Sequence, residues 1–255
     1  VFSASSFVAK NFDRLVLGKY VPNSSLAYYD KSFHMTSLPL TYFTYLLNSV
    51  LHPVLVKHTN NTKTIYNTYL KLLGAVSNLG LYFTFTLVLL SNEIILILLG
   101  DQWTEAGAIL QIMSLTIFFR MVTSSSIAVF QSTNNISLLR KFGSPLNIIL
   151  LINIAVVSYL FKNIHPVAIS MVAYYALEMI VYFVFLKKVF KGNELFRSSQ
   201  LFYLFGGGLK ILIFPMLAWL VFVWLEPTLI WKILIYIIFS VLGIWVFGIH
   251  RKILL

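Results

Sequence analysis

A short polar stretch near the start of the chain holds the first residues able to bind a ligand. It reads KNFDRLVLGKYV, residues 10–21, in a sequence that is 59% hydrophobic and 11% charged. On a helix, Lys10, Asp13 and Arg14 share one face because residues three and four positions apart are neighbours; Asn11 lies beside them. We expect Lys10 and Asp13 to neutralise each other, which leaves Arg14 as a surplus cation. That cation either binds an anion in a cavity or extends to the membrane surface as an anchor.

A second arginine, Arg120, lies near the middle of the apolar segment 106–130, on one helical face with Thr116 and Thr123. Placing an ionised side chain at mid-bilayer costs at least about 2.5–3.5 kcal/mol, so such residues usually face a bundle interior or a watery cavity. A guanidinium stays charged and binds phosphate oxygens through two parallel hydrogen bonds. We therefore expect Arg120 to line a cavity and bind an anion, with a structural ion pair as the alternative.

Two further ionisable side chains fall inside apolar segments. Glu178 lies at mid-depth of segment 165–186, and Lys210 follows three glycines in segment 202–225. Glu178 either forms an ion pair with Arg120 or Lys210, or carries a proton or cation for coupled transport. The sequence leaves these possibilities open, and the long side chain of Lys210 is also able to reach a membrane interface.

Several kinds of chemistry have no support in the sequence. The chain has no cysteine, its five histidines lack metal-ligand spacing, and it contains no Walker motif and no GxSxG nucleophile motif. We expect no cofactor, no metal and no enzyme activity, so transport would depend on gradients or downhill flux. The net charge of +11 does not indicate nucleic acid, because the basic residues are spread through short loops.

The apolar segments predict the elements that hold these side chains. Several of them exceed the ~20 residues that a helix needs to cross a bilayer. We predict an all-α, polytopic transmembrane helical bundle of about eight spans, which forms a single domain over residues 1–255. The predicted spans are 1–18, 36–56, 72–91, 106–130, 143–161, 165–186, 202–225 and 228–249. Residues 93–99 are too short to cross, so we expect them at the interface or at the start of a broken helix.

The charges of the predicted loops indicate the orientation. Lysines and arginines are concentrated in loops 57–71, 131–142 and 187–201 and in the tail after residue 249, whereas the alternate loops hold few. The positive-inside rule places the basic loops and the C-terminus in the cytoplasm. Because the chain opens inside an apolar stretch, we interpret it as a fragment whose upstream part is missing.

Two blocks of sequence resemble the polysaccharide biosynthesis exporters. The first, in residues 11–57, is similar to the pattern N-x-D-[KR]-x-x-[IL]-G-[KR]-x-[LV], followed by L-x-Y-Y, L-P-L and a Val-Leu-x-Pro end. The second, residues 93–115, is similar to a hydrophobic run followed by Gly, an acidic residue, Trp and Leu-Gln. The matching residues are Asn11, Asp13, Arg14, Gly18, Lys19, Tyr28, Tyr29, Pro39, Leu40, Val50, Leu51, Pro53, Gly100, Asp101, Trp103, Leu110 and Gln111.

This resemblance implies an O-antigen-type flippase of the multidrug/oligosaccharidyl-lipid/polysaccharide (MATE-like) superfamily, in a bacterial cytoplasmic membrane. The chain would correspond to spans 7–14, the second of two bundles, with the missing N-terminal half as its partner. Its substrate would be an undecaprenyl-diphosphate-linked glycan for surface polysaccharide, moved by alternating access. Arg14 and Arg120, with Lys10 and Asn11, would bind the diphosphate. The family often has an arginine after its Tyr-Tyr pair, where this chain offers Lys31 and His34.

Other functions remain open from the sequence. A cation-coupled drug antiporter of the same superfamily would use Asp13 and Glu178 as its cation-binding carboxylates, and an acidic cavity would favour it. An integral-membrane glycan polymerase is less favoured, because the longest predicted outer loop, roughly residues 19–35, is short for such an enzyme. A scaffold with the same fold but without transport activity is a further possibility.

Overall fold

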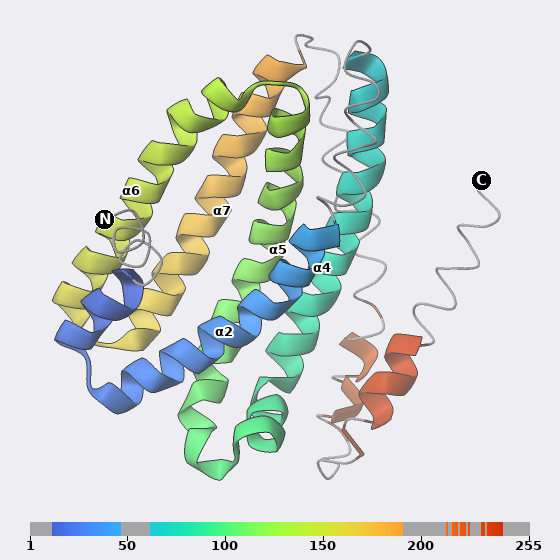
Figure 1. The fold of residues 1–255 in the computed structure, drawn as a ribbon. Helices are drawn as coiled ribbons and strands as arrows, with labels where there is room; N and C mark the ends of the chain where they lie inside the picture. Colours follow the sequence, from blue (N-terminus) through green and yellow to red (C-terminus); the bar gives the residue numbers. More distant parts are fainter. Residues whose placement is uncertain are drawn as a thin grey trace.

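The computed structural model of this protein is helical throughout the part that it describes. It describes residues 12–46, 62–190, 213, 216–218, 220–222, 224, 231–232 and 234–241. The elements with complete bounds are α2 (Asn23–Leu46), α4 (Thr62–Leu99), the 3-10 helix η2 (Asp101–Trp103), α5 (Thr104–Ser132), α6 (Ile136–Phe161) and α7 (Ile164–Val189). Residues 12–20 form a further helical segment before α2. The predicted all-α bundle is confirmed for these residues (Figure 1).

Four helices among the described residues are long and apolar enough to cross a membrane. They are Thr64–Leu99, Asp101–Ser132, Ile136–Phe161 and Ile164–Val189, and they correspond to the third, fourth, fifth and sixth predicted spans. The other predicted spans, 1–18, 36–56, 202–225 and 228–249, extend partly beyond the described residues.

The segment that we expected as an outer loop, residues 19–35, is mostly helix. The first helical segment ends at residue 20, and α2 begins at Asn23 after a break at Val21 and Pro22. The Leu26 N–H donates to the Pro22 carbonyl at 3.0 Å, so the new helix starts directly after the proline. Asn and Ser residues are common at helix starts, so those that follow Pro22 indicate a helix. The assignment of this stretch to a loop was wrong.

Helix α4 is longer than its predicted span and is kinked near its end. It begins at Thr62, inside the predicted loop 57–71, and Leu90 has non-helical φ and ψ of −110° and 15°. Residues 93–99 continue the helix beyond this kink, as expected for a broken helix. Gly100 ends it with φ of 89°, a conformation that glycine adopts without strain.

Close packing joins α4 to α5. A Cβ atom at Gly107 would collide with the side-chain oxygen of Asn92 on α4. A larger residue at this position would force the Asn92 side chain to move, and a Cβ would also lie only 3.3 Å from the Asn92 Cα. The following turns are also tight: Asn134 and Lys162 have φ of 57° and 48°, and they connect α5, α6 and α7 as successive antiparallel neighbours.

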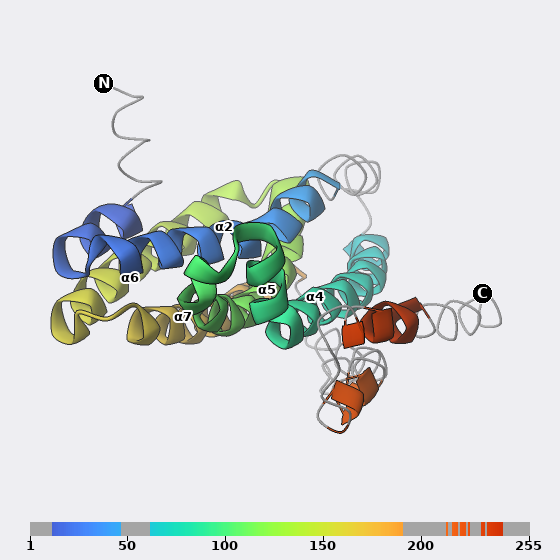
Figure 2. The same cartoon turned by 90° about the horizontal axis from the view of Figure 1, so that it is seen from below.

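Helix α5 is the centre of the bundle. It contacts α2, α4, α6 and α7, and Figure 2 shows α2, α4 and α7 around it. The core between these helices is aliphatic and aromatic; Ile117, Met121 and Phe130 of α5 are fully buried within it. Helix α2 crosses α5 obliquely in Figure 1. A polar side chain of α5 that faces α2 or α7 is consequently inside the bundle.

The outer surface of α6 and α7 is apolar. Ile148 and Ile152 of α6 and Ile180 of α7 are each more than half exposed. Exposed aliphatic side chains in such numbers are expected where a helix faces acyl chains. The exposed faces of α6 and α7 therefore agree with their assignment as membrane spans.

Candidate functional site

Charged and aromatic side chains from residues 12–20, α2, α5 and α7 meet in one place, which we call the polar cluster. Its members are Asp13, Arg14, Tyr29, Asp30, Phe33, Arg120, Tyr175 and Glu178. Three of the predicted site residues on separate helices, Asp13, Arg120 and Glu178, are thus brought together with Arg14. The predicted site residues Lys10, Asn11 and Lys210 lie outside the residues that the structure describes.

Tyr29 links three helices at the base of the polar cluster. Its side chain is fully buried, and its hydroxyl lies 3.2 Å from Asp13 Oδ2 and 3.2 Å from Met171 Sδ of α7. A phenol donates one proton, and the carboxylate is the stronger acceptor. Tyr29 therefore holds Asp13 in place.

Arg14 is not a surplus cation. Its Nε lies 2.5 Å from Asp30 Oδ1 of α2, and both side chains are more than one-third exposed. The prediction that Arg14 lacks an anionic partner was wrong because Asp30 had been assigned to a loop. With α2 helical from Asn23, Asp30 comes back against the first helical segment. An ion pair of this exposure contributes little to stability, but it satisfies the charge of Arg14.

Arg120 is held between two aromatic rings. Its Cζ lies 5.5 Å from the ring centroid of Phe33 on α2 and 5.0 Å from that of Tyr175 on α7. Phe33 in turn stacks on Tyr29 with centroids 6.1 Å apart. Two cation–π contacts fix the guanidinium between helices. This arrangement places Arg120 inside the bundle, as its depth in the sequence suggested.

One end of this guanidinium lacks a hydrogen-bond partner. Arg120 Nη1 is buried, and no described residue accepts a hydrogen bond from it. Thr123, on the same face one turn later, also has a buried hydroxyl without a partner among the described residues. By contrast, the hydroxyl of Thr116 donates to the Met113 carbonyl of its own helix at 2.7 Å. On this face of α5 the unpartnered polar atoms thus lie at and after Arg120; elsewhere among the described residues, Asn78, Ser158 and Ser240 also have a buried polar atom without a hydrogen-bond partner.

Glu178 interacts with Arg120 at longer range. The charges of Glu178 and Arg120 are within interaction range, but among the described residues no salt bridge within 4.0 Å joins them. The two groups therefore interact without forming an ion pair. Pairing between Glu178 and Lys210 is not tested, because Lys210 lies outside the described residues.

The described part of the polar cluster is not basic. It contains the carboxylates of Asp13, Asp30 and Glu178 and the guanidinium groups of Arg14 and Arg120. Asp30, which we had assigned to a loop, adds a third carboxylate to the cluster. Because Arg14 pairs with Asp30 and Tyr29 holds Asp13, Arg120 is the cation with capacity left for another anion.

The cations after the Tyr-Tyr pair lie outside the polar cluster. Lys31 and His34 are exposed, and Lys31 Nζ lies 5.9 Å from the ring centroid of Trp103. Trp103 also packs edge-to-face on Tyr28, with centroids 5.8 Å apart. These contacts are those of an interfacial aromatic anchor.

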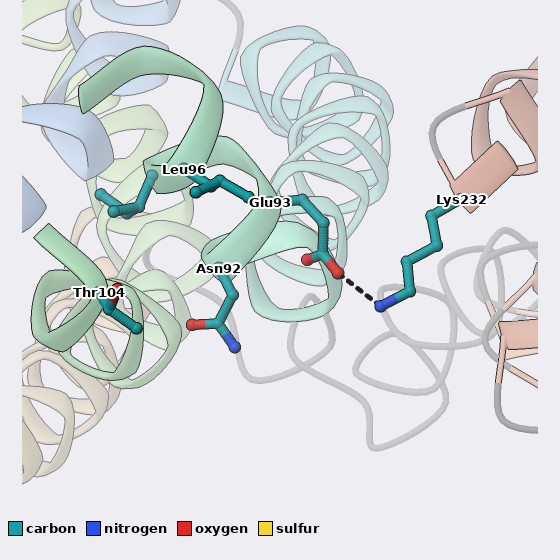
Figure 3. A pocket seen from close by; sticks show the side chains of 6 residues that line it. Asn92, Glu93, Leu96, Thr104 and Lys232 are labelled. Carbon is teal, nitrogen blue, oxygen red and sulfur yellow. Dashed lines mark hydrogen bonds and ion pairs between the residues drawn. The ribbon is translucent and has the colours of Figure 1, made fainter. Parts of the chain in front are cut away.

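A pocket of about 390 Å³ lies elsewhere, beyond the kink of α4. Figure 3 shows Glu93 of α4 reaching toward Lys232, and their side-chain atoms are 2.8 Å apart. Asn92, Glu93, Ile95, Leu96, Thr104 and Lys232 line the pocket. None of the predicted site residues belongs to it. The ion pair attaches the segment that contains Lys232 to α4, together with a hydrogen bond between Thr86 and Tyr236.

Sequence reasoning missed four members of the polar cluster: Tyr29, Asp30, Phe33 and Tyr175. Their common feature is that they become neighbours only through the contact of α2 and α7 with α5. A signal existed for Asp30, because Pro22 followed by Asn and Ser indicates a helix start and hence a helical Asp30. Within the described residues, no three His, Asp or Glu side chains are grouped as metal ligands would be.

The fold and these interior polar residues define a multi-pass α-helical membrane protein. Residues 1–108 match the family model described as "Polysaccharide biosynthesis protein". This match confirms the resemblance to polysaccharide biosynthesis proteins over that part of the chain, which includes Asp13, Arg14 and the residues of α2. Comparisons with curated proteins and with solved structures found no match.

Proposed function

We propose that this protein is the second bundle of a flippase for lipid-linked oligosaccharides in a bacterial cytoplasmic membrane. Its substrate class is an undecaprenyl-diphosphate-linked glycan for surface polysaccharide, carried by alternating access between two MATE-like bundles. The first bundle would come from an N-terminal half of the same protein, and the C-terminus would lie in the cytoplasm. The match of residues 1–108 to polysaccharide biosynthesis proteins supports the role in this process.

The observation that carries the proposal is the buried Nη1 of Arg120, which has no hydrogen-bond partner among the described residues. Leaving a buried donor without a partner costs about 1–3 kcal/mol, and more when the group is charged. An anion that accepts from this nitrogen removes the cost. Diphosphate oxygens suit a guanidinium particularly well, since they match its fork of parallel N–H groups.

The surroundings of Arg120 favour temporary binding. The rings of Phe33 and Tyr175 fix the guanidinium without consuming its hydrogen-bonding edges. Glu178 supplies a competing negative charge that does not close into a salt bridge. An anion bound here is therefore held between an attractive guanidinium and a repelling carboxylate, and release remains feasible. This balance is required of a transporter, which must bind its substrate and let it go.

The test is a translocation assay on the chain together with its upstream half. Proteoliposomes would receive a fluorescent polyprenyl-diphosphate oligosaccharide, and a membrane-impermeant quencher would report its appearance in the opposite leaflet. Arg120→Gln should slow translocation, and Lys162→Gln, which neutralises an exposed cation at the α6–α7 turn, is the matched control. Equal rates for the two variants would overturn the assignment of Arg120.

A second candidate is a cation-coupled drug antiporter of the same superfamily. The acidic excess in the described polar cluster favours it, because Asp13, Asp30 and Glu178 outnumber the two arginines. In that case Glu178→Gln would abolish cation-driven efflux of a lipophilic dye, whereas Arg120→Gln would have little effect. The opposite pattern is expected of the flippase. A glycan polymerase loses further support, since residues 23–35, most of the longest outer loop that we predicted, are helical.

A further inference from the structure

Four cations gather at the end of the bundle where α6 begins and α7 ends. Arg140 and Lys141 lie in the second turn of α6, and Lys187 and Lys188 lie in the last turn of α7. All four side chains are exposed. Because α6 and α7 are consecutive antiparallel helices, these positions come to the same end, at the top of Figure 1. We call these four residues the basic end patch.

Aromatic contacts bring the two pairs of cations together. Phe142, directly after Lys141, stacks on Phe185 of α7 with ring centroids 4.3 Å apart and an interplanar angle of 12°. Lys188 Nζ lies 4.8 Å from the centroid of the same Phe185 ring. Phe142 also packs edge-to-face on Tyr182, at 5.0 Å. The packing between α6 and α7 therefore joins the two segments that carry the cations, with Lys188 over the ring of Phe185.

The two helices that carry the basic end patch contain few acidic residues. Within α6 and α7, Glu178 is the only carboxylate. It precedes Lys187 by nine positions, roughly 13 Å along the helix axis, and its charge is within interaction range of Arg120. A concentrated positive charge at a membrane surface attracts anionic headgroups over distances of about a Debye length.

The surface next to the patch is shaped for acyl chains. On α7, the exposed residues Leu177, Ile180 and Val184 follow one another at spacings of three and four, and the next positions in this series are Lys187 and Lys188. On α6, an exposed aliphatic face that includes Ile148, Ile149 and Ile152 follows Lys141. Each helix thus presents an apolar stripe that leads to a pair of cations.

From this combination we propose that the basic end patch binds the phosphate headgroup of an anionic phospholipid, whose acyl chains lie along α6 and α7. Arg140 supplies the planar fork that suits a phosphate, and the lysines add charge around it. A soluble acidic protein fits less well, because the apolar stripes begin within one or two turns of the cations. This proposal is independent of the flippase assignment, since it concerns the outer face and not the polar cluster.

The test measures lipid binding to the full 255-residue chain purified in detergent. Native mass spectrometry would count bound molecules during titration with cardiolipin, phosphatidylglycerol or phosphatidylethanolamine. We expect the two anionic lipids to bind at least tenfold more tightly than the zwitterionic one. The variant with Gln at positions 140, 141, 187 and 188 should lose this preference.

Matched controls keep the outcome clear. Lys19→Gln/Lys162→Gln removes two exposed cations elsewhere on the described surface and should retain the preference. Arg140→Gln/Lys141→Gln and Lys187→Gln/Lys188→Gln each remove half of the patch and should each weaken cardiolipin binding severalfold. These half-patch variants also serve if the fourfold variant does not fold.

Equal binding of anionic and zwitterionic lipids by the parent chain, or unchanged cardiolipin binding in both half-patch variants, would overturn the proposal. If millimolar inorganic phosphate displaced the bound lipid as effectively as added cardiolipin does, the lipid assignment would be overturned as well.

Discussion

Replacing Arg120 with glutamine should separate a binding role from a structural one. The change removes two cation–π contacts, to Phe33 and Tyr175, and such contacts contribute about 0.5–1 kcal/mol each at partly exposed sites. It also removes a buried donor without a partner, which relieves about 1–3 kcal/mol. These effects oppose each other. We expect the free energy of unfolding of Arg120→Gln to differ from that of the parent chain by no more than about 2 kcal/mol.

Translocation should respond much more strongly to the same substitution. A hydrogen bond to a charged group contributes about 1.5–3 kcal/mol, which corresponds to roughly a 10- to 100-fold loss of rate when the bond is made in the transition state. The proteoliposome quenching assay measures this rate, and denaturant titration in detergent measures the stability. Arg120→Lys retains the charge without the fork and should recover only part of the activity.

The refuting result is equally specific. If Arg120→Gln lowered the free energy of unfolding by more than about 3 kcal/mol, or prevented membrane insertion, Arg120 would be a structural partner whose loss leaves buried charge uncompensated. If stability and translocation both stayed at parent values, the unpartnered nitrogen would have no ligand to bind.

Three further substitutions test the surroundings of the site. Tyr29→Phe removes the hydroxyl that holds Asp13 and should lower the free energy of unfolding by about 1–2 kcal/mol. Gly107→Ala places a Cβ where the Asn92 side-chain oxygen lies, so that side chain must move, and the free energy of unfolding should fall by about 1 kcal/mol. Asn92→Ala should reduce this loss, and full stability of the single variant would contradict the packing. Gly100→Ala strains a φ of 89° and should cost about 1 kcal/mol in the same unfolding assay.

The central spans were predictable because their chemistry is local. Helices α5, α6 and α7 follow from apolar runs bounded by turn residues, and their observed bounds lie within three residues of the predicted ones, except that α6 begins seven residues earlier. The interior position of Arg120 also followed from its depth in such a run, since exposing a guanidinium to acyl chains is costly.

The partners of the site residues were less predictable because they depend on tertiary contacts. The assignment of residues 19–35 to a loop hid the helix that carries Asp30, and the pairing of Arg14 was consequently missed. The aromatic rings around Arg120 belong to α2 and α7. These helices are far from Arg120 in the sequence and reach it only because they pack on α5. Phenylalanine and tyrosine are common throughout this chain, so their composition alone did not indicate which of them would contact the arginine.

The central claim is that Arg120 binds a diphosphate inside the bundle, and equilibrium binding tests it most directly. The measurement compares a short-chain prenyl diphosphate with the corresponding prenyl alcohol, on the purified parent chain and on Arg120→Gln. We predict that the diphosphate binds the parent chain more tightly than the alcohol does, and that Arg120→Gln weakens diphosphate binding roughly 10-fold or more without changing alcohol binding. Equal affinity of the parent chain and Arg120→Gln for the diphosphate would contradict the account.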